Sequence, residues 1–401
     1  MHPLQPILDR RGELGKEPGL HALIVGVSEY RHLPAAGAAP DEIKKKFGMT
    51  RLTSPALSAV RVWRWLVHRQ DKLTAKLATC RLLLCPSPAE IASCPELKDF
   101  PSGASFEAFA EAAAEWRTNA AQRATDVTFV YFAGHGVQEA NTEDHVVLLE
   151  DFAAPGAALR NGVRVSEILA GMAPRDEQAA IARTQFYFFD TCRNTPEQFE
   201  KFAMAQVGSI WNVIQTQMVD DRACPWFCAA EPRGMAYAGK DHQTLFSQAL
   251  LACLEGGAGT PVDEGDLERG WAVSVASLAG GLPTHLDLLN AEAGANQAPS
   301  INRYNGRPVI HFLDAPPPVD VTVTVTPDDA VPVTRVAVFD EADDVKCDLG
   351  PPTDHPYRDT LQAGDYRVVA TVDPAAAVFA SKRTTLKARP PHSPLQLRIG
   401  R

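Results

Sequence analysis

The first three hundred residues alternate between continuous apolar runs and stretches with a helical period. Residues 22–27, 81–85, 127–135 and 184–192 are rich in β-branched, aliphatic and aromatic side chains and show little polar alternation. Such runs are typical of strands buried on both faces of a parallel sheet. Between them, residues 55–68 place apolar side chains on one helical stripe, and residues 106–116 and 165–172 also predict helices. The alternation predicts an α/β fold with a mainly parallel sheet and helices on both faces.

The pattern changes after Asp314-Ala-Pro-Pro-Pro318, a stiff and polar segment that predicts a domain boundary. Residues 319–325 alternate strictly between apolar and polar, as in a half-buried antiparallel strand, and three further strand-like runs follow between Pro- and Asp-rich turns. We therefore expect an N-terminal extension (1–19), an α/β domain (20–314) and a small all-β sandwich (319–401). The sandwich holds no catalytic constellation. Stability, docking, substrate recognition and autoinhibition all stay open as its role.

Composition narrows the class of protein. The chain has 401 residues, 45% of them hydrophobic, and a formal net charge of −10. This acidic balance argues against a nucleic-acid partner, because phosphate binding needs basic patches. No stretch approaches the ~20 continuous apolar residues of a membrane helix, and the first residues lack the apolar core of a secretory signal. We expect a cytoplasmic protein that binds neither nucleic acid nor membrane.

Eight cysteines are present without the paired C-x-x-C spacing of a zinc site. Cys224 and Cys228 could contribute two ligands, but no matching second pair follows them. Reduced thiols in a cytosol are the favoured interpretation, and they suit a thiolate nucleophile, which an oxidising compartment would cap. No metal and no cofactor are expected.

Two of the apolar runs end at residues that carry chemistry. The first stops at Gly134-His135-Gly136 and the second at Asp190-Thr-Cys192. A lone Cys is usually an inert buried residue and a lone His a structural group, but the carboxyl ends of parallel strands are where catalytic groups gather. Together, a base and a thiol on neighbouring strand ends predict a nucleophilic dyad. The flanking glycines leave room for a substrate carbonyl, and the amides of Gly136 and Cys192 could form an oxyanion hole.

These motifs carry a family resemblance. His-Gly after one apolar strand and Asp-Thr-Cys-Arg-Asn after another resemble the caspase and metacaspase clan of cysteine peptidases, in which the His of caspases precedes the Cys by about 50 residues. Residues 22–30, 226–231, 235–238, 244–251, 297–300 and 309–313 resemble further segments of that clan, so the likeness covers roughly residues 20–314. The resemblance implies a caspase-like fold and a cysteine endopeptidase that acts on protein or peptide substrates.

Two residues bear on specificity, and they point in opposite directions. Asp190 stands two residues before the nucleophile, which is the metacaspase pattern, where this Asp lines a pocket for a basic residue; a carboxylate pairs well with Arg or Lys in such a slot. Arg51 stands where caspases place a pocket Arg that holds Asp. Asp190 could instead cap a loop, and Arg51 could be one solvated charge. Cleavage after Arg or Lys is favoured, with cleavage after Asp as the alternative.

The resemblance also implies self-processing between Cys192 and the strand that begins near Trp226, because that segment lies beside the site in this clan. We expect a cut after Arg222, which should lie on an exposed tip, or after Lys201. A backbone carbonyl could orient His135, since no third triad residue can be named.

Other classes of function stay open. One is a catalytically silent caspase-like scaffold that binds partners; an α/β hydrolase or nucleotide-binding domain is weaker, because neither a nucleophile elbow nor a P-loop appears. By family analogy alone, a stand-alone prokaryotic caspase-like chain suggests a separate activating protein and a role in bacterial antiviral defence or cell death.

Overall fold

The computed structural model describes residues 7–100, 103–139, 144–156, 158–176, 179–197, 206–211, 218–239, 243–262, 270–302, 306, 308–350, 355–375 and 378–400. These residues form two compact units. One contains residues up to Leu251 together with Leu286–Pro308, and the other contains Ala252–His285 and Val309–Arg401. The second unit therefore includes more of the chain than the expected sandwich of residues 319–401.

The first unit is built on a sheet of seven strands in the order β1-β3-β2-β4-β8-β9-β12. Neighbouring strands from β3 to β9 are parallel, and only the edge strands β1 and β12 pair in the antiparallel sense. This confirms the α/β fold that the apolar runs predict. The strands are β1 (Leu8–Asp9), β2 (Gly19–Val27), β3 (Lys76–Cys85), β4 (Val127–Ala133), β8 (Thr184–Asp190), β9 (Trp226–Cys228) and β12 (Ser300–Asn302).

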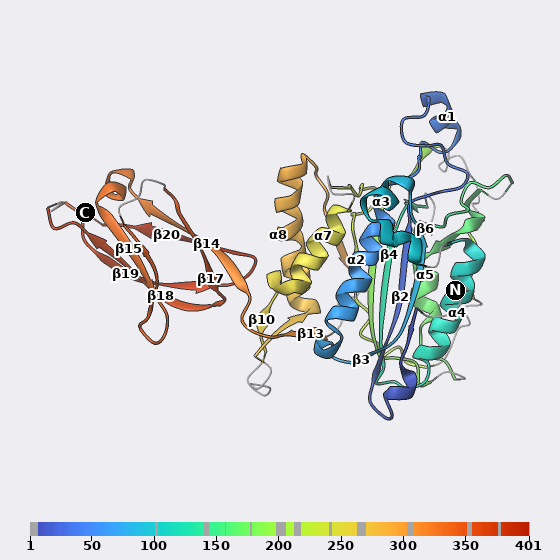
Figure 1. The fold of residues 1–401 in the computed structure, drawn as a ribbon, viewed down its shortest axis with the longest axis horizontal. Coiled ribbons are helices and arrows are strands. Elements are labelled where there is room, and N and C mark those ends of the chain that lie inside the picture. Colours follow the sequence, from blue (N-terminus) through green and yellow to red (C-terminus); the bar gives the residue numbers. More distant parts are fainter. Residues whose placement is uncertain are drawn as a thin grey trace. The chain divides into compact units, whose positions relative to one another are not determined.

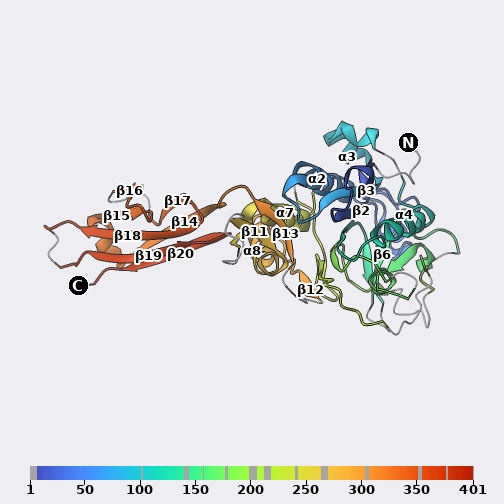
Figure 2. The same ribbon diagram turned by 90° about the horizontal axis from the view of Figure 1, so that it is seen from below.

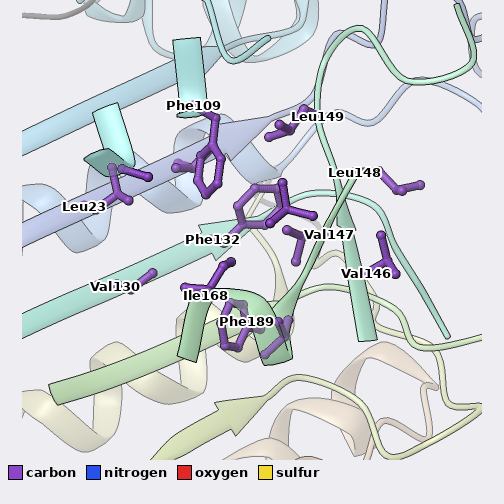
Figure 3. Close-up of a cluster of buried hydrophobic side chains, with 14 of the residues drawn as sticks. Leu23, Phe109, Val130, Phe132, Val146, Val147, Leu148, Leu149, Ile168 and Phe189 are labelled. Atoms are coloured by element: carbon purple, nitrogen blue, oxygen red, sulfur yellow. The ribbon is translucent and has the colours of Figure 1, made fainter. Parts of the chain in front are cut away.

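Helices cover both faces of this sheet, and Figure 1 shows α2 and α4 on opposite sides of β2. On the α4 side, Leu23, Phe109, Val130, Phe132 and Phe189 belong to one buried apolar cluster (Figure 3). The helices of the first unit include α1 (Pro40–Lys45), α2 (Pro55–His68), α3 (Pro88–Ser93), α4 (Phe106–Ala120) and α5 (Val165–Gly171). The chain also forms α7 (Leu245–Ala252) and α8 (Val275–Ala293), each with residues in both units.

A glycine sets the distance between α2 and the sheet. Gly26 alternates with Val25 and Val27, which belong to the cluster on the α4 side, so its position faces α2. A Cβ at Gly26 would stand 2.7 Å from both Ala56 Cα and Ala59 Cβ. The helix therefore packs against bare backbone at this point, close to the end of β2.

A small antiparallel sheet follows His135 directly. It contains β5 (Gly136–Gln138), β6 (His145–Leu148) and β7 (Gly162–Arg164), with Gly136 paired to Val147. Val146, Val147 and Leu148 of β6 join the apolar cluster on the α4 side of the main sheet. The hairpin is thus fixed to the main core beside the point where β4 ends.

The second unit contains a three-stranded sheet and a β-sandwich (Figure 2). The three-stranded sheet has β10 (Thr260–Pro261), β11 (Trp271–Ser274) and β13 (Val309–Leu313). One sandwich layer is ordered β17-β14-β20 and the other β16-β15-β18-β19, which confirms the small all-β region. Strand β14 pairs antiparallel with β17 but parallel with β20. The sandwich strands are β14 (Pro318–Thr326), β15 (Thr334–Phe339), β16 (Val345–Leu349), β17 (Tyr357–Gln362), β18 (Gly364–Val372), β19 (Lys382–Ala388) and β20 (His392–Arg398).

Among the residues that the structure describes, no helix combines the length and the apolar character needed to cross a membrane.

Candidate active site

Strand register places His135 and Cys192 at equivalent positions on neighbouring strands. Ala133 of β4 pairs with Asp190 of β8, and each candidate residue lies two positions beyond its strand's end. The two turns touch, because a Cβ at Gly136 would stand 2.6 Å from the Cys192 carbonyl oxygen. The structure therefore brings the His-Gly and Thr-Cys turns together, and it explains why Gly136 carries no side chain.

A backbone carbonyl orients His135. The imidazole Nε2 lies 2.7 Å from the Thr50 carbonyl oxygen, which can only accept, so Nε2 carries the proton and Nδ1 does not. The His135 amide donates to the Tyr30 hydroxyl at 2.6 Å, and the two rings lie 4.8 Å apart. Burial lowers the pKa of His135 to about 4, against the opposing effect of the Thr50 hydrogen bond. At neutral pH His135 is an uncharged base with Nδ1 available for a proton.

The thiol of Cys192 contacts the segment that follows β9. The Ala236 amide donates to Cys192 Sγ at 3.2 Å. Burial raises the pKa of Cys192, the Ala236 hydrogen bond opposes this, and the nearby Asp190 carboxylate adds to the increase. The resting pair is therefore a neutral thiol and a neutral imidazole rather than a thiolate–imidazolium ion pair.

Asp190 is a buried carboxylate with one oxygen engaged and one open. The Tyr131 hydroxyl donates to Oδ2 at 2.6 Å, and the Thr244 hydroxyl donates to the same oxygen. Within the described part of the chain, Oδ1 has no hydrogen-bond partner. Burial raises the pKa of Asp190 to about 6, although both hydroxyl donors lower it. An unpartnered buried carboxylate oxygen two residues from the nucleophile is suited to a cationic ligand.

Arg51 already has partners on its own loop. Its guanidinium pairs with Glu29, and its Nε donates to the Leu33 carbonyl at 2.9 Å. The neighbouring Thr50 supplies the carbonyl that orients His135. The segment therefore contributes to the site through its backbone, while the charge of Arg51 is paired with a carboxylate.

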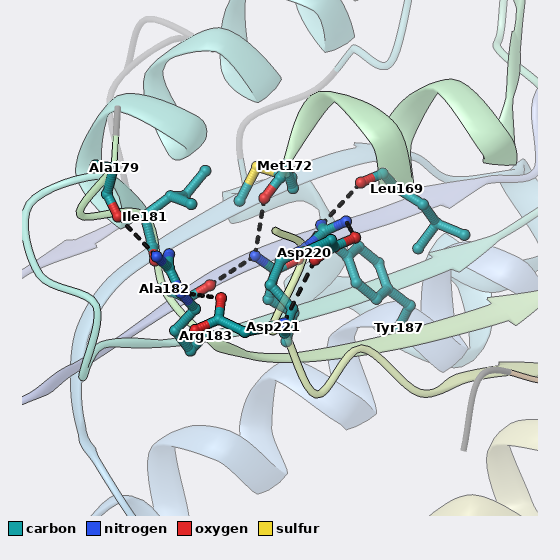
Figure 4. Close-up of polar contacts among 11 residues, drawn as sticks. Leu169, Met172, Ala179, Ile181, Ala182, Arg183, Tyr187, Asp220 and Asp221 are labelled. Atoms are coloured by element: carbon teal, nitrogen blue, oxygen red, sulfur yellow. Dashed lines mark hydrogen bonds and ion pairs between the residues drawn. The ribbon is translucent and has the colours of Figure 1, made fainter. Parts of the chain in front are cut away.

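The expectation that Arg222 lies on an exposed tip is wrong. The residue is only 3% exposed. Its guanidinium donates to the Leu169 carbonyl at 2.9 Å, to Gln185 Oε1 at 3.0 Å, and through two nitrogens to the Asp220 carboxylate. Figure 4 labels Leu169 and Asp220, two of these partners. Asp220 and the carbonyl oxygens of Leu169 and Gln185 compensate the charge of the Arg222 guanidinium. Arg222 therefore anchors the segment that leads into β9. The other expected cleavage residue, Lys201, lies outside the described residues.

A second His–Cys pair lies close to the site, and sequence reasoning missed it. His145 Nδ1 is 3.8 Å from Cys228 Sγ, and both residues are buried. Burial raises the pKa of the Cys228 thiol to about 12 and lowers that of His145 to about 3. A thiol without charge or solvent access is a poor nucleophile, so this pair is structural rather than catalytic.

Within the described ranges, no group of three or more His, Cys, Asp or Glu side chains lies close enough together to hold a metal ion.

Residues 89–278 match the family model of the caspase domain, a range that contains both His135 and Cys192 but not Arg51. No curated protein matches the chain.

Proposed function

Because residues 89–278 match the family model of the caspase domain, we propose that the chain is a cysteine endopeptidase with His135 as its base and Cys192 as its nucleophile. The observation that carries this proposal is the placement of both residues two positions beyond paired strand ends, with Thr50 holding the proton on His135 Nε2. This tautomer is the one that a base acting through Nδ1 requires.

The chemistry follows from the resting state. His135 Nδ1 takes the thiol proton as Cys192 Sγ attacks the substrate carbonyl carbon, and the carbonyl electron pair moves to its oxygen. In this proposal the Gly136 and Cys192 amides stabilise that oxyanion. His135 then passes the proton to the amide nitrogen as the C–N bond breaks, leaving a thioester on Cys192. Water, deprotonated by His135, attacks the thioester and releases the acid and the free thiol.

Cys192→Ala and His135→Ala test the dyad. Each should reduce peptide cleavage to background without a change in melting temperature, because losing either half of a dyad costs about as much as losing both. Cys80→Ala, which removes a buried thiol from β3, is the control and should stay active. Near wild-type turnover by Cys192→Ala would contradict the assignment. Absence of cleavage by the wild type against a broad peptide library would favour a silent scaffold.

We propose that the enzyme cleaves after Arg or Lys. The support is the open Oδ1 of the buried Asp190, together with the pairing of the Arg51 charge with Glu29, which leaves Arg51 less suited to hold a substrate carboxylate. Asp190→Asn should lower kcat/KM for Arg substrates by about 100-fold or more, as when a charged hydrogen bond is lost. Arg51→Ala should matter less. Strict cleavage after Asp, lost in Arg51→Ala, would establish the opposite pocket.

We propose Lys201 rather than Arg222 as the site of self-processing, because cutting after the buried Arg222 requires its anchored segment to open first. Intact-mass analysis of the purified protein decides this. A cut after Lys201 that is absent in Cys192→Ala supports the proposal, and a cut after Asp220 or Asp221 would contradict both it and the basic specificity.

We further propose, from the family likeness and from the eight free cysteines, that the chain acts in the cytoplasm on protein substrates. A separate protein would activate it in a bacterial defence or cell-death response. Toxicity of wild type but not of Cys192→Ala when each is co-expressed with candidate activators would support this role.

A further inference from the structure

A buried histidine contacts the turn that carries the nucleophile. His145 is the first residue of β6 and is 2% exposed. Its Nε2 lies 2.7 Å from the hydroxyl oxygen of Thr191, which is fully buried and immediately precedes Cys192. His145 is not part of the proposed dyad. Nothing in the sequence around His145 distinguishes it from an ordinary strand residue. Its contact with Thr191 connects the β5–β6 hairpin to the end of β8.

The surroundings of His145 fix which nitrogen carries its proton. Burial, and then the nearby Arg193 guanidinium, lower the pKa of His145 against the opposing effect of a hydrogen bond with the Cys192 backbone, so the ring is neutral at physiological pH. The Cys228 thiol beside Nδ1 keeps its proton because burial raises its pKa. The thiol can donate to Nδ1, which leaves the ring proton on Nε2, where it is donated to Thr191 Oγ1.

The position of the Thr191 hydroxyl decides how closely the two catalytic turns approach. A Cβ at Gly136 would stand 2.5 Å from Thr191 Oγ1 and 2.6 Å from the Cys192 carbonyl oxygen. Because the Thr191 hydroxyl packs against the bare backbone of Gly136, a shift of Thr191 also moves the neighbouring amides. Those amides, of Gly136 and Cys192, are the ones proposed to bind the oxyanion, and such donors must be placed within a few tenths of an ångström.

We propose that His145 is a positioning residue, which holds Thr191 through Nε2 and thereby sets the spacing of the Gly136 and Cys192 amides in the oxyanion hole. This role rests on the proposed peptidase function. His145 touches neither the substrate nor the Cys192 thiol; it acts through Thr191 and through a hydrogen bond with the Cys192 backbone. Its loss should therefore reduce stabilisation of the transition state more than binding of the substrate.

The fold offers a matched control at the other end of the sheet. His21 and Thr79 are also buried, and His21 Nδ1 lies 2.9 Å from Thr79 Oγ1. His21 lies near the start of β2 and pairs with Thr128 near the start of β4, whereas the dyad follows the ends of β4 and β8. Thr191→Val and Thr79→Val therefore remove the same type of hydrogen bond, one beside the nucleophile and one remote from it.

Steady-state kinetics with an Arg peptide give the first readout. Thr191→Val and His145→Phe should each lower kcat by about 10- to 100-fold, less than deletion of an oxyanion donor, with KM within about twofold of wild type. The double variant should lose no more than either single one, because the two residues act as a unit. His145→Gln, which keeps an N–H near the position of Nε2, should recover most of kcat. Thr79→Val should keep kcat within about twofold.

Amide hydrogen exchange of residues 191–193 gives a second readout, which does not depend on peptidase activity. Exchange should be at least about tenfold faster in Thr191→Val and His145→Phe than in wild type and Thr79→Val. If the wild type cleaves no peptide, the proposed function fails, while the exchange rates still test the positioning role. Unchanged exchange in both site variants, or a kcat for Thr191→Val equal to that for Thr79→Val, would overturn the inference.

Discussion

At the residue scale, burial without charge compensation dominates the site. His135, Asp190 and Cys192 all have their pKa values shifted mainly by burial, and each shift favours the uncharged form. At neutral pH His135 and Cys192 are therefore uncharged, whereas Asp190, with a pKa of about 6, is mostly ionised. Two pH dependences follow, and they involve different groups.

Asp190 should make the protein less stable as the pH rises. Its pKa of about 6 lies above the ordinary value of 3.8, so between pH 4 and 6 the folded state holds a proton that the unfolded state has released. Stability therefore falls as pH rises through this window, by at most about 3 kcal/mol for one group. Asp190→Asn, which stays uncharged, should gain stability relative to wild type from pH 4 to pH 7. Urea unfolding at both pH values checks this.

The control for that measurement is Glu111→Gln, which alters an exposed carboxylate on α4. Its stability relative to wild type should be nearly the same at both pH values. A difference between Asp190→Asn and wild type that does not change with pH would show that Asp190 is already charged at pH 4.

Alkylation of Cys192 should become faster with pH without an early plateau. Burial raises the thiol pKa above its ordinary 9.0, and His135 is neutral, so no ion pair generates thiolate at neutral pH. The rate of reaction with iodoacetamide, followed by mass spectrometry of the Cys192 peptide, should still be rising at pH 9. His135→Ala should show a similar profile. A plateau by pH 7 that disappears in His135→Ala would reveal a resting ion pair instead.

At the element scale, the sequence predicted those strands that are apolar throughout. The expected strands 127–135 and 184–192 correspond to β4 and β8, which begin where expected and end two residues earlier, at Ala133 and Asp190. Both are apolar because both faces of the sheet are covered. The expected strand at 81–85 begins earlier, at Lys76, because the added residues include the polar Lys76 and Thr79, and Thr79 finds a buried partner in His21. A strand that contains polar residues cannot be recognised in full from its hydrophobic positions alone.

The same limit applies to the site. His135 and Cys192 could be predicted because strand ends collect catalytic groups. Thr50 and Ala236 could not, since they contribute backbone atoms that every residue has. The burial of Arg222 could not be predicted from the sequence either. The partners that compensate its charge include the carbonyl of Leu169 and the side chain of Gln185, which are far from Arg222 in the sequence.

The contact between α2 and β2 gives a prediction at this scale. Gly26→Ala should lower the free energy of unfolding by about 1–3 kcal/mol, as typical for overpacking, because the added Cβ would meet the backbone and Cβ atoms of α2 at 2.7 Å. Gly12→Ala, where a Cβ meets nothing within 4 Å, is the control and should be close to neutral. Equal stability of the two variants in urea unfolding would show that α2 can move away at little cost.

At the scale of the whole molecule, the candidate active site and the sandwich belong to different compact units of the chain. His135, Cys192, Asp190 and His145 all lie in the first unit. The sandwich has an apolar core of its own, made from alternate residues of its strands, such as Val319, Val321, Val323 and Val325 of β14. Trp271 of β11 packs against the edge of this core, where it is only partly buried.

This separate core predicts that residues 315–401 fold alone. A domain of this size buries enough apolar surface to be stable without the rest of the chain, and the missing Trp271 should cost stability rather than the fold. The isolated fragment should show a β-type circular dichroism spectrum and one cooperative urea transition, at a lower midpoint than the transition of the sandwich in the intact protein.

Val323→Asp, which places a carboxylate in the core, should abolish that transition, whereas Thr322→Asp on the alternate, less buried side of β14 should retain it. A fragment that unfolds without cooperativity would show that the sandwich depends on β10, β11 and β13, and that these strands belong to its folding unit.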